Sequence, residues 1–284
     1  MANADHLNRL VRAPRARAAT RHSPTPRRYA LPDGLVGGSR IGHSACVAND
    51  ALVRAIDGLY DTFARYERPA TFLACGCCWE GRVVPGARWK NTQRPLVEVD
   101  APGGESALRT VPASALTDVA LDVPVTGGSI DLFKHYLPRL FEIVAVEADP
   151  NDWDIEIVVG HLSVSVERGG DAWWNWPDTE QAAVDQYLRG LWEVRRRGTS
   201  NEADYTLCAI GLVVPDIQPY LDAWSNDQQQ WAIDNLATFA ADNAAALTGA
   251  DLRNPFWTDK RQPAQSNRVR VVQWLRDLPS LSST

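Results

Sequence analysis

The chain has 284 residues, 45% of them hydrophobic and 23% charged, which is typical of a globular protein long enough to bury a core. Residues 1–45 hold eight arginines against two acids, a local balance of +6. Since the whole chain sums to −6, residues 46–284 carry −12. An acidic body argues against a nucleic-acid-binding protein, which needs a basic face to neutralise phosphates. No apolar run approaches the roughly 20 residues of a membrane-spanning helix.

The charge difference also divides the chain. Residues 1–45 are rich in arginine and proline and lack the apolar stretch of a secretion signal. We therefore predict a basic, disordered leader over 1–45 and a single helical domain over 46–284. The five cysteines are odd in number and three lie within four residues. Because that is poor material for a disulfide framework, the cysteine pattern predicts a reducing, cytoplasmic location.

The first predicted helix runs from Asn49 to Tyr66, because apolar residues recur there at helical spacing and Asn49 can cap it. The segment over 72–128 is irregular, rich in cysteine and punctuated by prolines. We expect loops there, with a small hairpin using the strand-like residues 95–99. A helical turn is expected over 114–121.

Helical spacing returns over 132–144 and continues through Pro138, which predicts a kink or the start of a second helix at the proline. Residues 154–166 alternate between apolar and polar in a way that fits a strand. The capping residue Asp154 and the helical neighbours favour a helix instead, and we predict a helix.

The clearest helix covers residues 178–197, with Asp178 and Gln181 as a predicted capping box. Three arginines, Arg195 to Arg197, end it where the helix dipole favours cations. A further helix is predicted after Ser225, with Gln228 completing a box and Gly249 as its stop, and a last one over 267–277. The pattern predicts an all-α fold, either a multi-helix bundle or a stacked helical array.

Several short motifs occur in a recognisable order. They are YDTFARY at 60–66, CGCC at 75–78, DLFKHYLPR at 131–139, WP with EQAAV at 176–184, PYLDAW at 219–224, FW at 256–257 and WL at 274–275. This order resembles an uncharacterised group of bacterial proteins, and the resemblance covers roughly residues 49–277. It implies a helical fold and adds no mechanism.

The cysteine cluster is the candidate metal site. Cys75 and Cys78 have the C-x-x-C spacing that lets two thiolates face one tetrahedral Zn²⁺, and Cys77 lies between them. Because four ligands are needed and no second C-x-x-C exists, His135 is the leading candidate for the remainder. The other candidates are His161, Cys46 and Cys208. A redox dithiol, packed thiols and a thiolate nucleophile with His135 as its base are the alternatives.

The second candidate site is a tryptophan cluster. Trp173, Trp174 and Trp176 crowd four positions before the predicted helix. One of three large rings this close could lie exposed and contact a protein partner or a carbohydrate. A hydrophobic staple that closes the start of the helix is the interpretation that we favour for the same residues.

The leading functional hypothesis is a non-enzymatic cytoplasmic interaction protein. It is motivated by strong helical stripes and by an acidic body suited to a basic protein partner. An immunity- or antitoxin-like protein is one form of it. A zinc- or thiol-dependent enzyme using residues 75–78, and carbohydrate or peptide binding through residues 173–176, are the other two hypotheses.

Overall fold

The computed structural model describes residues 41–68, 71–75, 91–95, 108–123, 129–146, 154–164 and 172–278. For residues 41–48, 71–75, 91–95, 118, 121, 122 and 164 it describes the backbone alone. All these residues belong to one compact unit, Arg40–Thr284. The basic leader predicted over 1–45 lies outside the described residues except at 41–45.

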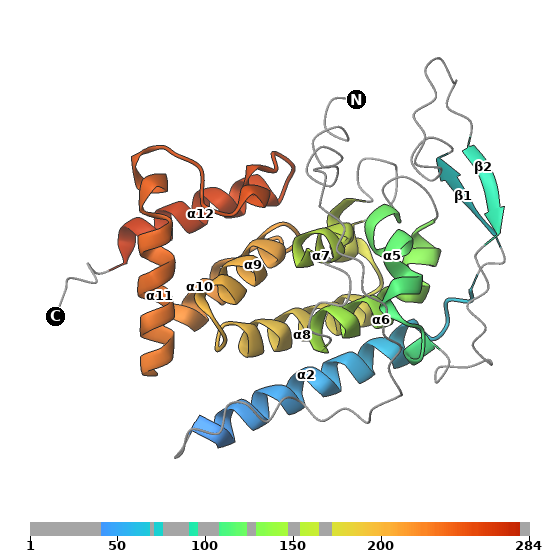
Figure 1. Ribbon diagram of the computed structural model, residues 1–284, viewed down its shortest axis with the longest axis horizontal. Helices are drawn as coiled ribbons and strands as arrows, with labels where there is room; N and C mark the ends of the chain where they lie inside the picture. Colours follow the sequence, from blue (N-terminus) through green and yellow to red (C-terminus); the bar gives the residue numbers. More distant parts are fainter. Residues whose placement is uncertain are drawn as a thin grey trace, which may run out of the picture. The chain divides into compact units, whose positions relative to one another are not determined.

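Helices make up most of the described chain (Figure 1). The α-helices are α2 (Ile41–Phe63), α5 (Ala113–Asp122), α6 (Ile130–Val146), α7 (Ile155–Val164), α8 (Asp178–Arg195), α9 (Ser200–Gly211), α10 (Gln218–Ser225), α11 (Gln230–Asp242) and α12 (Ala264–Asp277). The 3₁₀ turns are η2 (Trp173–Asn175), η3 (Ala244–Thr248) and η4 (Pro255–Thr258). The strands are β1 (Thr71–Cys75) and β2 (Asn91–Pro95). The prediction of an all-α helical array is confirmed.

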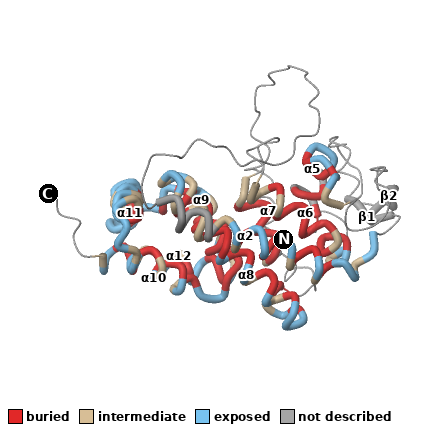
Figure 2. The backbone as a smooth tube through the Cα atoms, turned by 90° about the horizontal axis from the view of Figure 1, so that it is seen from below, coloured by how far each residue is buried: buried red, intermediate tan, exposed pale blue. Residues whose placement is uncertain are grey.

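The array is organised around the pairing of α2 with α8 (Figure 1). Gly190 lets these helices approach closely, since a Cβ there would lie 3.2 Å from the Cα of Leu52. Helix α6 packs on α2, α7 packs on α9, and α9 continues the array to α11 and α12. Figure 2 shows buried residues following α6, α7 and α8, whereas α11 is largely exposed. No helix among the described residues is long and apolar enough to cross a membrane.

Two uncertain segments prove to be single helices. Helix α6 continues through Pro138 from Ile130 to Val146, so no second helix starts at the proline. The neighbours Leu137, Leu140 and Phe141 are each 0% exposed. Their burial offsets the roughly 3 kcal/mol that an interior proline costs. Residues 155–164 form α7 and no strand, because most of its apolar side chains pack into the core at once.

The helix starts differ from the prediction at several points. The capping box of Asp178 and Gln181 is wrong: Pro177 occupies the N-cap position and no side chain caps α8. Gln181 instead donates from Nε2 to the carbonyl of Trp176 at 2.6 Å. The box at Gln228 is also wrong, since α11 begins at Gln230 without a side-chain cap. A true capping box stands at the start of α9, where Thr199 and Glu202 bond reciprocally.

The irregular segment contains two short elements. Strands β1 and β2 pair antiparallel with Thr71 opposite Pro95 and Cys75 opposite Asn91. Strand β2 ends at Pro95, the first residue of the strand-like segment predicted over 95–99, and residues 96–99 lie outside the described residues. Helix α5 covers the helical turn predicted over 114–121.

Candidate functional site

The most concentrated polar network in the region of the sequence motifs is centred on Glu180, in the first turn of α8. Its side chain is 0% exposed, and that of its partner Lys134 on α6 is 7% exposed. Lys134 Nζ lies 2.7 Å from Glu180 Oε2, and Tyr66 donates its hydroxyl to Oε1 at 2.6 Å. Lys134 also donates to the Tyr66 hydroxyl at 3.1 Å, which closes a triangle of side chains. Arg65, which is half exposed, adds a further ion pair to Oε1.

These partners keep Glu180 ionised. Burial by itself would raise the pKa of this carboxyl, but the hydrogen bonds from Lys134, Tyr66 and Arg65 together lower it. The ring of Trp176 adds a cation–π contact, with Lys134 Nζ 4.2 Å from its centroid. The network therefore holds a buried, compensated charge pair between α6 and α8.

Three sequence motifs meet in this network. Arg65 and Tyr66 end the YDTFARY motif, Lys134 belongs to DLFKHYLPR, and Trp176 and Glu180 belong to the segment that opens α8. Tyr66 and Glu180 are 114 positions apart in the chain. The motifs that carry the family resemblance thus supply the polar contacts that tie α2, α6 and α8 together.

His135 lies beside this network on α6. Its Nδ1 is 2.8 Å from the carbonyl oxygen of Tyr66. Burial lowers the pKa of His135, so the neutral ring prevails at pH 7. Because a carbonyl accepts hydrogen bonds only, Nδ1 carries the proton and Nε2 carries the lone pair. A histidine that ligates a metal through Nε2 has this tautomer, with Nδ1–H bonded to a backbone carbonyl.

Of the predicted zinc ligands, the cysteines of the cluster cannot be placed as side chains. Cys75 ends β1, where the backbone alone is described, and Cys77 and Cys78 lie outside the described residues. The described residues contain no group of three or more His, Cys, Asp or Glu arranged to hold a metal ion. The zinc site remains a prediction.

The alternative ligands are placed in part. Cys46 lies on α2 where the backbone alone is described. Cys208 is a free, buried thiol on α9, and burial raises its pKa well above the usual value. His161 on α7 is buried, with Nε2 2.6 Å from the carbonyl oxygen of Ala120. Burial lowers the pKa of His161 to about 4. It therefore joins α7 to α5 as a neutral ring.

The three predicted partner-binding tryptophans differ in exposure. Trp173 is 5% exposed and donates Nε1–H to the carbonyl of Val213 at 2.9 Å. Trp176 is 4% exposed and packs edge-on against Phe63, with ring centroids 6.0 Å apart. Trp174 is half-buried and packs against the same core. Trp174 is thus the most solvent-exposed ring of this cluster.

A second network at the α2–α6 interface has no counterpart in the sequence analysis. Glu142 on α6 accepts from Tyr60 at 2.7 Å and from Arg139 at 3.0 Å. The guanidinium of Arg109 lies over the Tyr60 ring, 3.9 Å from its centroid, and pairs with Asp57 at 2.5 Å. Charged side chains therefore link α2 to α6 through Glu142 as well as through Lys134.

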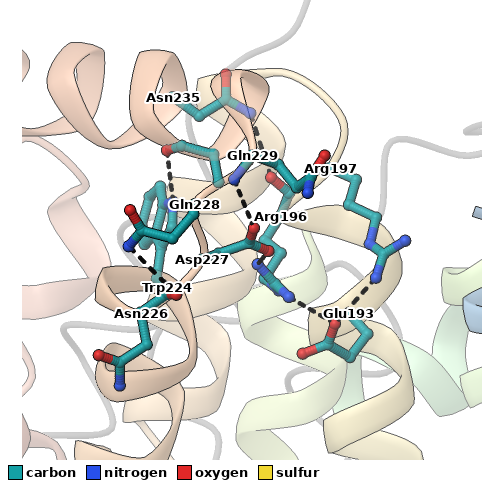
Figure 3. Close-up of polar contacts among 10 residues, drawn as sticks. Glu193, Arg196, Arg197, Trp224, Asn226, Asp227, Gln228, Gln229 and Asn235 are labelled. Carbon is teal, nitrogen blue, oxygen red and sulfur yellow. Dashed lines mark hydrogen bonds and ion pairs between the residues drawn. The ribbon is translucent and has the colours of Figure 1, made fainter. Parts of the chain in front are cut away.

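The arginines at the end of α8 form a third network (Figure 3). The Arg196 side chain is 6% exposed and pairs with Asp227 at 2.6 Å and Glu193 at 2.7 Å. Asn235 donates to the carbonyls of Arg196 at 3.2 Å and Gly198 at 2.9 Å. These contacts join α8 to the start of α11. The arginines thus bridge helices in addition to standing at the C-terminus of α8.

The sequence matches no protein-family model and no curated protein, and the fold matches no solved structure.

Proposed function

We propose that the protein is a non-enzymatic interaction protein that binds a basic protein partner through helices α10, α11 and α12. The Glu180 network bears on the first half of this proposal. Its lysine, tyrosine, arginine and carboxylate bond to one another and join three helices. Side chains that bond to one another in this way stabilise the fold. The network therefore favours a structural role for the sequence motifs over a catalytic one.

The observation that carries the proposal is a set of exposed carboxylates on the outer helices. Asp222, Asp234 and Asp277 are exposed. Each accepts a hydrogen bond from the glutamine four residues earlier, at 2.7, 2.8 and 2.9 Å respectively. Among the described residues no arginine or lysine forms a salt bridge with these three carboxylates. A glutamine amide does not neutralise a carboxylate, so each of the three aspartates presents its negative charge at the surface, Asp277 on a helix that also carries Arg268, Arg270 and Arg276.

The surrounding sequence and surface support the same partner chemistry. Residues 198–252 contain no lysine or arginine. Exposed aliphatic side chains lie on the same elements: Ile233 on α11, Leu247 on η3 and Val269 on α12. Helix α10 packs against α11 and α12, so these elements form one connected group. A surface with carboxylates and aliphatic side chains fits a partner that offers lysine, arginine and apolar groups.

Affinity capture with matched variants tests the proposal. The Asp222→Asn/Asp234→Asn/Asp277→Asn variant keeps the glutamine hydrogen bonds and removes three charges from α10–α12. The control, Asp50→Asn/Asp61→Asn/Asp178→Asn, removes three exposed charges from α2 and α8. We expect the wild type and the control to retain one basic protein in stoichiometric amount and the α10–α12 variant to lose it. Equal retention by both variants, or no stoichiometric protein on the wild type, contradicts the proposal.

An immunity- or antitoxin-like protein, which neutralises another protein by binding it, is one form of this function. In that form the captured protein is itself toxic to cells, and co-expression of this chain relieves the toxicity. The α10–α12 variant should then fail to relieve it. Kinship with the uncharacterised bacterial group and a cytoplasmic location remain predictions from the sequence.

A zinc site is the second candidate function, and the tautomer of His135 favours it. The Nδ1–H bond to Tyr66 leaves the Nε2 lone pair outside that contact, and the predicted cysteine ligands follow Tyr66 by nine to twelve residues in the chain. Elemental analysis of tag-free protein tests it. The expected result is one zinc per chain in the wild type and none in Cys75→Ser/Cys78→Ser or His135→Gln. Zinc retained by His135→Gln removes that residue from the site, and no zinc in the wild type removes the candidate.

A further inference from the structure

Two acidic side chains are buried where α7 packs on α9. Glu156, in the first turn of α7, is 4% exposed and accepts a hydrogen bond from Asn254 Nδ2 at 2.6 Å. Asp204 on α9 is 3% exposed, and its Oδ1 is buried without a hydrogen-bond partner. Among the described residues neither carboxyl forms a salt bridge. A buried carboxylate without a paired cation is costly, so this arrangement favours the protonated, neutral form of both groups.

The groups around them act in both directions. The hydrogen bond from Asn254 lowers the pKa of Glu156, whereas Asp154 and Asp204 raise it. Arg253 lowers the pKa of Asp204, whereas Asp242 raises it. The Cys208 thiol, one turn beyond Asp204 on α9, senses both carboxyls and also Asp259. Burial is the largest influence and raises the pKa of Glu156 to about 7 and that of Asp204 to about 6.

Residues 252–258, here called the strap, lie between η3 and α12 in the chain and contact both α7 and α9. Leu252, Asn254 and Trp257 of the strap are 3%, 2% and 0% exposed. The Trp257 ring is seated against α9, since a Cβ on Gly211 would lie 2.3 Å from its Cη2 atom. Asn254 ties the strap to Glu156 on α7 and also accepts from the amide of Phe256 at 3.0 Å. The strap is thus held by one aromatic contact and one carboxyl contact.

We propose that the strap is a pH-responsive element, seated on α7 and α9 while Glu156 and Asp204 are protonated and released when they ionise. Ionisation places two negative charges in a buried site whose described surroundings hold no paired cation. Hydration lowers the free energy of these buried charges, and in this proposal water reaches Glu156 when Asn254 and Trp257 move away. The inference goes beyond the proposed partner binding and stands independently of it.

Hydrogen exchange of the full chain tests the proposal. The amide of Arg253 donates to Asn243 outside the strap, and the amides of Phe256 and Trp257 donate to Asn254, the strap residue that also bonds Glu156. We expect their protection, corrected for the intrinsic pH dependence of exchange, to fall about ten-fold or more between about pH 5.5 and pH 8, since one pKa unit corresponds to a factor of ten. The Glu156→Gln/Asp204→Asn variant, which mimics the neutral carboxyls, should keep its protection throughout.

Asp251→Asn is the matched control, because Asp251 is exposed and pairs with Arg268 away from the acidic pair. It should lose protection as the wild type does. Constant protection of the wild type across this range overturns the proposal, as does equal loss in the double variant. If the double variant does not fold, the wild type alone decides: a midpoint between about pH 6 and pH 7 supports the proposal, and its absence overturns it.

Discussion

Glu180→Gln is the substitution that most strongly perturbs the network joining α2, α6 and α8. It removes the only carboxylate that faces Lys134 in the described network, while Gln still accepts hydrogen bonds from Tyr66 and Arg65. Lys134 is then a buried ammonium without a counter-ion. Leaving one member of a buried pair uncompensated costs about 3–5 kcal/mol. We expect that loss in the free energy of unfolding, and a fall in Tm of several degrees.

Urea unfolding followed by circular dichroism measures this loss, with an unchanged m value as the sign that the folded state is otherwise intact. Asp185→Asn on the same helix is the control. It breaks an exposed pair with Arg189, whose side chains are 42% and 57% exposed, and should cost less than about 1 kcal/mol. Lys134→Met combined with Glu180→Gln removes the stranded ammonium and should recover most of the loss.

The pH dependence adds an independent test of the same reasoning. Since its hydrogen-bond partners lower the pKa of Glu180 in the folded state, its contribution is present above the ordinary carboxyl pKa of about 4.3 and is lost as pH falls through the folded value. The difference between wild type and Glu180→Gln should shrink accordingly on acidification. A Glu180→Gln cost no greater than that of Asp185→Asn refutes the reasoning.

Three further predictions follow from other contacts. Gly211→Ala should lower the free energy of unfolding by about 1–3 kcal/mol in urea, because its Cβ would lie 2.3 Å from the Trp257 ring. Gly160→Ala is the control: its Cβ would lie 3.8 Å from Leu212, an ordinary contact, and should not lower the free energy of unfolding. Thr199→Ala removes the capping box of α9 and should cost about 1 kcal/mol by thermal unfolding. Burial raises the pKa of Glu156 to about 7, so wild-type stability contributed by this group falls as pH rises from about 4.5 through 7. Glu156→Gln should therefore be more stable than the wild type by about 3 kcal/mol at pH 8 and equal to it below pH 4. A variant less stable than the wild type at pH 8 would contradict a raised pKa for Glu156.

The helices whose apolar residues form a clear stripe were predictable from the sequence. Helices α2, α6, α8 and α12 were found by that spacing, and α7 was found despite an alternating pattern. Helices α9 and α10 were missed. Most of α9 is buried, so its apolar residues surround the helix and leave no single stripe. Helix α10 is an eight-residue element, too short to show a repeat.

The convergence of the motifs could not be predicted from spacing. Glu180 in a first helical turn is what the helix dipole favours, and nothing local indicates that its side chain is 0% exposed. Its partners Tyr66 and Lys134 lie far away in the chain, so tertiary packing brings them together. The burial of Glu156 and Asp204 is hidden for the same reason, because acids near helix starts are ordinarily solvated.

The exposure of each ring in the tryptophan cluster could not be predicted from the sequence. Trp173 and Trp176 are buried and Trp174 is half-buried against the same core, and whether any of the three rings contacts a partner stays a prediction. Which ring keeps surface depends on the turn of η2 and on the contact of Trp176 with Lys134. Neither is visible in the sequence.

Quantitative capture by wild type and by the Asp222→Asn/Asp234→Asn/Asp277→Asn variant decides whether α10–α12 bind a partner. We expect one basic protein bound to the wild type at about one copy per chain, and its loss from the variant with the helical signal unchanged. A partner held equally by both proteins would place the interface elsewhere and refute binding through these three aspartates.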